Sequence, residues 1–173
     1  MSRIYLELLS EEHADALYRF ENDNRGTFDE ESYSRHSSYY ERSTFQSILE
    51  ELIEEQGQQL HAMYLVFIDE GTLIGRVNLM RLMKEPFVKA EIGYRIAPPF
   101  QGKGHATEAV RLLLEKAKKI YSLHRVEARI SVENAAACKV LEKNGFRHVG
   151  TYEKYIRFAD EWIDSHLFEI VLD

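Results

Sequence analysis

The chain has 173 residues, of which 45% are apolar and 29% charged, and 22 basic residues against 29 acidic ones give it a net charge of −7. This composition is ordinary for a globular protein, so we expect one domain over residues 1–173. The negative charge argues against nucleic acid as a partner, because the phosphate backbone attracts basic proteins.

The chain carries no pattern typical of a membrane span or of a secretion signal. Its longest apolar run, Ala62–Ile68, is far shorter than the roughly 20 residues that a membrane-spanning helix needs. The first residues lack a charged segment followed by an apolar one. The single cysteine, Cys138, excludes an internal disulfide and a zinc site of several cysteines. We therefore expect a cytoplasmic protein without a membrane partner.

The first third of the chain is predicted to be mainly helical. Arg3–Leu8 is predicted to be a short strand, and Ser10 is a suitable N-cap for the helix that follows it. The polar and aromatic stretch Asn22–Tyr40 is predicted to form loops or short helices. An amphipathic helix that ends near Gly57 is indicated by apolar residues at helical spacing, namely Phe45, Ile48, Leu49, Leu52 and Ile53.

A group of three strands is predicted next. Ala62–Ile68 and Leu73–Leu82 are apolar runs joined by a turn at Asp69, Glu70 and Gly71. From Val88 to Ile96 apolar residues alternate with Lys89, Glu91, Gly93 and Arg95, which predicts a strand with one buried face.

The rest of the chain alternates between helices and strands. Helical spacing from Ala106 to Tyr121 is followed by an alternating strand from Val126 to Val132. Asn134 is predicted to cap a short helix that ends at Asn144 and Gly145, and two strands separated near Ala159 complete the chain. The order βααβββαβαββ predicts an α+β fold, like a three-layered α/β fold, with a mixed sheet.

The most informative stretch is the loop Gln101–Thr107, which joins a strand to a long helix. Gly102 and Gly104 permit backbone conformations that side chains block, and the helix start presents free N–H groups. This combination indicates a phosphate-binding loop, although a plain strand-to-helix turn also contains glycines. The dinucleotide motif fails at Thr107, where it needs glycine, and the P-loop motif fails because Gly104 follows Lys103.

Three motifs in order resemble the GNAT family of acyl-CoA N-acyltransferases, over most of the chain. Gln101–Ala106 matches that family's Gln/Arg-x-x-Gly-x-Gly/Ala loop, and Val132–Phe146 is similar to its Asn-x-x-Ser helix, which ends in Gly-Phe. Glu91–Tyr94 resembles the strand that precedes the loop. Gly150–Tyr152 and Trp162–Asp164 are similar to the ribosomal-protein-alanine N-acetyltransferase subgroup.

The resemblance implies a splayed mixed sheet with helices on both faces and acetyl-CoA as the cosubstrate. The pyrophosphate would lie on the loop, and the pantetheine arm would pair with the strand that holds Tyr94 and Ile96. Asn134 would hydrogen-bond the arm from the opposite wall. The residues that this implies for the loop are Gln101, Gly102, Lys103, Gly104, His105, Ala106 and Thr107.

Positive charge for the phosphates would come from Lys103, His105, Lys139 and Lys143, although each could equally be a solvated surface charge. This distinction matters because the chain as a whole is acidic, so an anionic ligand needs a local positive site.

Acetyl transfer to an amine also needs groups that move protons. Glu91 aligns with the general base of some family members, but it would serve equally well in a structural ion pair. Ala137 stands where the family often has a serine that helps to protonate the leaving thiolate, so Tyr152 becomes a candidate acid, or a half-buried sheet aromatic. Cys138 is expected to be an inert helix residue, and the histidine spacing predicts no metal site.

We therefore expect an enzyme that moves an acetyl group from acetyl-CoA to a primary amine, on a peptide N-terminus or a small molecule, by direct attack. A non-catalytic acyl-CoA-binding module is the alternative, because Ala137 departs from the family pattern; a nucleotide-binding regulatory domain is weakened by the missing third glycine. Monomer and homodimer both stay open. The resemblance implies that the acceptor site is walled by Asn22, Asn24, Phe28, Tyr33, Tyr39 and Tyr40, although a packed loop would explain them too.

Overall fold

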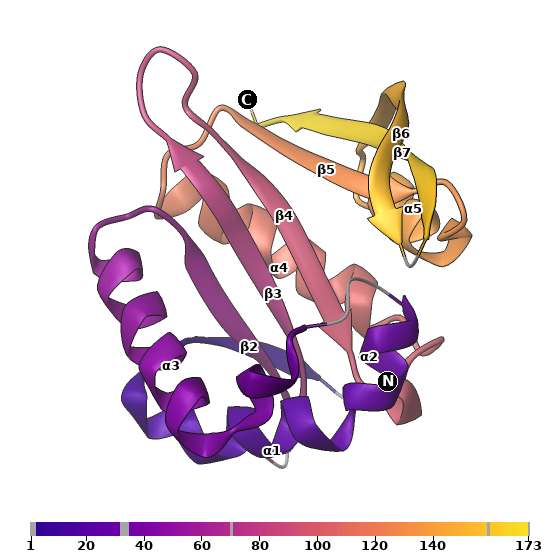
Figure 1. Ribbon diagram of the computed structural model, residues 1–173. Coiled ribbons are helices and arrows are strands. Elements are labelled where there is room, and N and C mark those ends of the chain that lie inside the picture. Colours follow the sequence, from indigo (N-terminus) through magenta and orange to yellow (C-terminus); the bar gives the residue numbers. More distant parts are fainter. Residues whose placement is uncertain (1–2, 32–34, 70, 159, 173) are drawn as a thin grey trace.

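A seven-stranded mixed sheet in the order β1-β2-β3-β4-β5-β7-β6 organises the computed structural model, which describes residues 3–31, 35–69, 71–158 and 160–172 (Figure 1). β4 and β5 are parallel, whereas the other neighbouring strands run antiparallel. Three positions named in the sequence predictions lie outside the described residues: Tyr33 of the acceptor wall, Glu70 of the predicted turn and Ala159 between the last two strands. The strands are β1 (Ile4–Leu8), β2 (Ala62–Ile68), β3 (Leu73–Met83), β4 (Lys89–Ile96), β5 (Arg125–Ser131), β6 (Arg147–Phe158) and β7 (Glu161–Val171).

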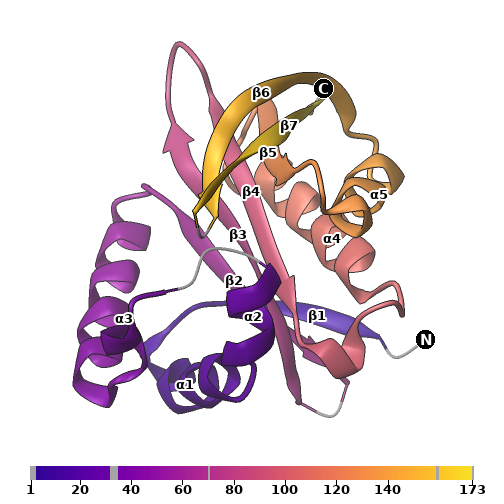
Figure 2. The same ribbon diagram turned by 45° about the vertical axis from the view of Figure 1, so that its right-hand side comes forward.

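Helices cover both faces of this sheet, as predicted (Figures 1 and 2). α4 (His105–Lys119) and α5 (Ala135–Lys143) lie on one face, which we call the α4 face. On the opposite, α1 face lie α1 (Ala14–Asp23), α2 (Arg25–Glu31) and α3 (Arg42–Gly57). Short 3-10 turns are η1 (Glu11–His13), η2 (Ser37–Tyr40) and η3 (Pro98–Phe100).

The predicted element order is confirmed, with one addition. α2 is an extra helix inside the stretch that was expected to form loops or short helices. Asn134 caps α5 as predicted, since its Oδ1 accepts a hydrogen bond from the backbone N–H of Ala137 at 3.0 Å. In the described part of the chain, no helix is both long and apolar enough to cross a membrane.

Strand alternation sorts the apolar side chains into two cores, one on each face of the sheet. The sheet residues of the α4-face core pack against α4 at Ala109, Val110 and Leu113. On the α1 face, Met63 and Leu65 pack against Leu17, Phe20, Phe45 and Leu49. Both faces of β2 are therefore covered, which explains why its sequence is a continuous apolar run rather than an alternating one.

The sheet divides between β4 and β5. These parallel strands pair only at their first residues, from Lys89 opposite Arg125 to Glu91 opposite Glu127. Beyond that point β4 stays paired with β3 as far as Ile96, while β5 stays paired with β7 as far as Ser131. The second half of β4 therefore has an edge that faces β5 without pairing to it, and we call this opening the split.

The close approach of β3 and β4 depends on Gly75, which lies opposite Ile96. A Cβ atom at Gly75 would collide with the carbonyl oxygen of Arg95 and would lie 2.6 Å from Ile96 Cδ1. We expect Gly75→Ala to lower the free energy of unfolding by about 1–3 kcal/mol, as overpacking does. At Gly150 a Cβ atom would meet nothing within 4 Å. Urea unfolding should therefore show a change within about 0.5 kcal/mol for the control Gly150→Ala; equal losses would contradict this account.

Candidate functional site

The loop between β4 and α4 has the backbone of an anion-binding turn. Gly102 and Gly104 adopt φ angles of +69° and +83°, a region that favours glycine. α4 begins at His105, directly after Gly104. Because the first turn of a helix has N–H groups without intrahelical acceptors, the amides from His105 to Thr107 are available to an anion at the positive end of the helix dipole. The geometry fits a phosphate group.

Side chains of the loop brace its backbone instead of pointing outward. Gln101 Nε2 donates to the carbonyl oxygen of Ile96 at 2.9 Å, and Lys103 Nζ donates to that of Pro99 at 2.7 Å. The ring of His105 is buried, and its Nδ1–H donates to the carbonyl oxygen of Phe100 at 3.0 Å. The expectation that the His105 ring presents positive charge to a ligand is therefore wrong, because this ring is used inside the loop. Its backbone amide remains part of the turn.

The split opens beside this loop. Tyr94 lies on the half of β4 that does not pair with β5, and its hydroxyl donates to the carbonyl oxygen of Ala137 on α5 at 3.3 Å. Burial raises the pKa of this hydroxyl, and the neighbouring Cys138 raises it further. Tyr94 thus connects β4 to α5 across the split, on the α4 face. Ile96 has a buried side chain, and Asn134 lies exposed at the start of α5, on the other side of the split.

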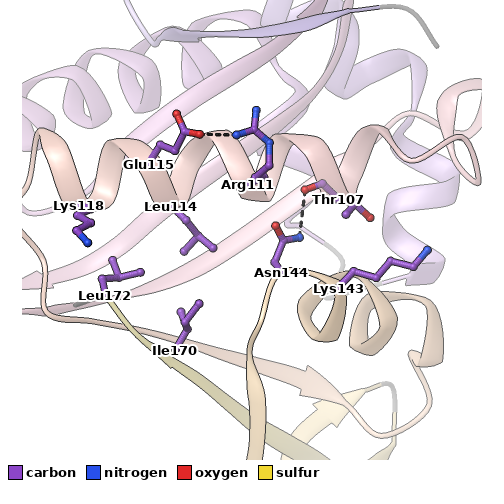
Figure 3. A pocket seen from close by; sticks show the side chains of 9 residues that line it. All are labelled: Thr107, Arg111, Leu114, Glu115, Lys118, Lys143, Asn144, Ile170 and Leu172. Carbon is purple, nitrogen blue, oxygen red and sulfur yellow. Dashed lines mark hydrogen bonds and ion pairs between the residues drawn. The ribbon is translucent and has the colours of Figure 1, made fainter.

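A hollow of about 400 Å³ adjoins the first turn of α4 (Figure 3). Thr107 and Lys143 border it near the loop, and Asn144 Nδ2 ties α5 to α4 by donating to the Thr107 carbonyl oxygen at 3.1 Å. The hollow extends along α4, away from the split, to Leu114 and Lys118. Lys143 is exposed, so its charge is close to the loop and open to solvent.

Glu91 stands at the point where the two strands part, with its side chain on the α1 face. Its Oε1 accepts hydrogen bonds from Arg81 Nη1 at 2.9 Å and from Arg129 Nη2 at 2.5 Å. Glu91 therefore forms the ion pairs that its structural alternative predicts. Arg129 comes from the far side of the split, so this pair spans it. No motif marks Arg129 as a site residue, although the alternation of β5 places it on the same face as Glu127.

Tyr152 lies on β6, beside a second residue that sequence analysis missed. Between Tyr152, opposite Ser165, and Ile156, opposite Ile163, β6 has two more residues than β7. This bulge lets the rings of Tyr152 and Tyr155 stack with centroids 4.9 Å apart. Tyr155 Oη accepts a hydrogen bond from Arg129 Nη1 at 2.8 Å. Tyr152 is therefore linked to Glu91 through Tyr155 and Arg129.

The remaining candidates make contacts within the protein. Cys138 is half-buried on α5, and burial raises the pKa of its thiol, as does the charge of Glu142, which disfavours the nucleophilic thiolate. Asn22 and Asn24 donate to carbonyl oxygens of their own helix, and Phe28 is buried. Among the described residues, no group of three His, Cys, Asp or Glu side chains is arranged to hold a metal ion.

Comparisons with known proteins agree with this geometry. The family model of the acetyltransferase (GNAT) domain matches residues 3–147. The probable N-acetyltransferase YjcK of Bacillus subtilis (strain 168) is 31% identical over 172 residues, which cover 97% of this chain and 93% of that protein.

Two solved structures share the fold. Ribosomal-protein-S5-alanine acetyltransferase from Vibrio fischeri superposes with a TM-score of 0.93 at 24% identity, over 100% of this chain and 95% of that one. Spermidine N-acetyltransferase from Vibrio cholerae, solved with CoA and spermine, gives a TM-score of 0.83 at 22% identity, over 98% and 95% of the two chains. With the loop, the split and the family match together, the chain belongs to the GNAT acetyltransferase family and is an acetyl-CoA-dependent N-acetyltransferase.

Proposed function

We propose that the acceptor is a primary amine, on a peptide N-terminus or a small molecule, that enters from the α1 face and attacks acetyl-CoA bound in the split. The split carries this proposal, because its open β4 edge leads to a turn whose backbone fits a phosphate group. Relatives act on a ribosomal protein alanine or on spermidine according to their names, and both acceptors are amines. The chain would work as a monomer or a homodimer in the cytoplasm.

The residues that would hold acetyl-CoA lie along one line. The turn Gly102–Thr107 would receive the pyrophosphate through its backbone amides, with Lys143 adding charge beside it. The unpaired edge of β4 at Tyr94 and Ile96 would pair with the pantetheine amides as with an added strand. The Nδ2 group of Asn134 would meet the arm from α5. Acetyl-CoA supplies an activated thioester, and the protein supplies its position.

Proton transfer is the second task of the site. Glu91 would accept the proton of the amine through a water, while Arg81 and Arg129 hold the carboxylate at the point where β4 and β5 part. Tyr152 would donate a proton to the departing thiolate from the stacked pair on β6. Thiol release from acetyl-CoA, measured with a panel of peptides, amino acids and polyamines, tests the activity; a CoA-binding protein that acetylates none of them would contradict the proposal.

Gly104→Val should weaken CoA binding at least tenfold, or about 1.4 kcal/mol. The φ angle of +83° is unfavourable for a β-branched residue, so the turn must change shape and withdraw amides from the phosphates. Calorimetric titration with CoA measures the effect. As a control, Gly71→Val places the same strain, at φ +76°, in the β2–β3 turn, outside the loop, and should leave CoA affinity unchanged. Full affinity in a folded Gly104→Val variant would refute the phosphate turn.

Cys138→Ala should retain most of the activity, because the amine attacks the thioester directly and the Cys138 thiol favours its neutral form. Steady-state rates with acetyl-CoA and an accepted amine check this expectation. Intact-mass spectrometry during turnover provides the second measurement. An acetyl group on Cys138 that forms and decays at the rate of turnover would contradict direct attack.

Glu91→Gln should lower kcat/KM at least 10²-fold at pH 7, the low end for loss of a general base, with CoA affinity little changed. The loss should shrink as the pH rises, because the free amine then becomes abundant. Glu127→Gln is a matched control, since Glu127 lies opposite Glu91 and is also ion-paired, with Lys89. Near wild-type activity of Glu91→Gln at pH 7 would leave Glu91 with its structural role alone.

A further inference from the structure

A cluster of charged side chains lies buried on the α1 face, beside the second half of β4. At its centre is Glu21 of α1, whose side chain has no exposed surface. Its carboxylate oxygens lie 3.1 Å from Arg76 Nε, 3.4 Å from Arg35 Nη1 and 3.9 Å from Arg95 Nη1. Three guanidinium groups from three segments of the chain thus surround one carboxylate. We call these four residues the Glu21 cluster.

The charges in the Glu21 cluster are unbalanced. Burial lowers the pKa of Arg95 to about 10, and repulsion from Arg76 and Arg35 adds to this effect. The rings of Tyr39 and Phe28 offset part of the cost, since the guanidinium carbons of Arg35 and Arg95 lie 4.0 and 5.0 Å from their centroids. Such contacts do not replace a counter-ion, because a buried charge needs a charged or hydrogen-bonding partner.

Several buried nitrogen and oxygen atoms of the cluster also lack hydrogen-bond partners in the part of the chain that the structure describes. Among the described residues, Arg76 Nε, Arg35 Nη1 and both carboxylate oxygens of Glu21 are buried and make no hydrogen bond of acceptable geometry. The ion-pair distances are short enough for attraction, but the N–H groups do not point along them. Three guanidinium groups hold more N–H donors than the lone pairs of one carboxylate can satisfy, so a further carboxylate would find hydrogen-bond donors here.

The cluster lies on the same face as Glu91. Arg95 follows Glu91 and Gly93 on that side of β4, and four residues of strand correspond to about 13 Å. Arg76 is the cross-strand partner of Arg95. With Arg81 and Arg129 around Glu91, the described residues place five arginines and two glutamates along this stretch. The side chains of Arg35 and Arg95 are 21% and 19% exposed, so a protein of net charge −7 carries an excess of positive charge here that solvent reaches.

We propose that the acceptor is an amine that carries a carboxylate, which binds at the Glu21 cluster while the amine lies at Glu91. This inference rests on the proposed function and narrows its substrate class. A spacing of about 13 Å corresponds to about four extended residues, so the fitting acceptor is a peptide with an acidic residue near its fourth position. A polyamine has positive charge along its whole length, and the arginines would repel it.

Amidated peptides of sequence Ala-Ala-Ala-Glu and Ala-Ala-Ala-Gln, with spermidine and glycine beside them, test this inference. We expect kcat/KM at least tenfold higher for the Glu peptide than for the Gln peptide, mainly through KM, and the lowest values for spermidine and for glycine, whose carboxylate lies too close to its amine. Arg35→Gln should reduce the preference to about twofold. Arg42→Gln, an exposed arginine paired with Asp15, is the matched control and should keep it.

Binding of the two peptides in the presence of CoA, measured by calorimetry, separates this inference from the proposed function. Tighter binding of the Glu peptide without acetylation would overturn the proposed function alone. Equal affinity and equal kcat/KM for the two peptides would overturn this inference alone, whether or not Arg35→Gln folds. Loss of CoA affinity instead of peptide affinity in Arg35→Gln would assign the cluster to CoA and also overturn it.

Discussion

The parting of β4 and β5 is the constraint on which the site depends. A continuous parallel pair would satisfy the backbone of both strands and leave no edge for a ligand. Because pairing stops at Glu91 and Glu127, each half-sheet needs its own support, from β3 for β4 and from β7 for β5. Tyr94 on one face and Arg129 on the other then bridge the opening without closing it. The open edge of β4 and the bridging side chains beside it therefore both result from the parting of the two strands.

The glycine turn and the split divide the binding of acetyl-CoA into two physically different parts. At the turn, neighbouring carbonyl oxygens accept hydrogen bonds from the side chains of Gln101, Lys103 and His105. These bonds hold the backbone in a conformation that fits a phosphate. Along the second half of β4, the backbone N–H and C=O groups that face β5 have no described strand to pair with, so they can bind a ligand. Both parts use main-chain groups, which explains how a chain of net charge −7 would bind an anionic cosubstrate.

Sequence analysis predicted the elements that depend on local pattern. The alternation around Glu91, the helical spacing after Ala106 and the cap at Asn134 each reflect neighbours in the chain, and each is confirmed. Contacts between distant segments were not predictable in this way. Arg129 meets Glu91 only because β5 lies beside β4, and the His105 ring turns inward only because Phe100 lies within reach. The burial of Glu21 was not predictable either, since one acidic residue on a helix gives no sign of burial.

The bulge in β6 has a consequence for how this hairpin tolerates change. The two additional residues before Ile156, together with the hydrogen bond from the Lys154 N–H to Asp164 Oδ1, decide the direction of Tyr155. A deletion of one residue between Tyr152 and Ile156 would therefore disturb both the tyrosine pair and its hydrogen bond with Arg129.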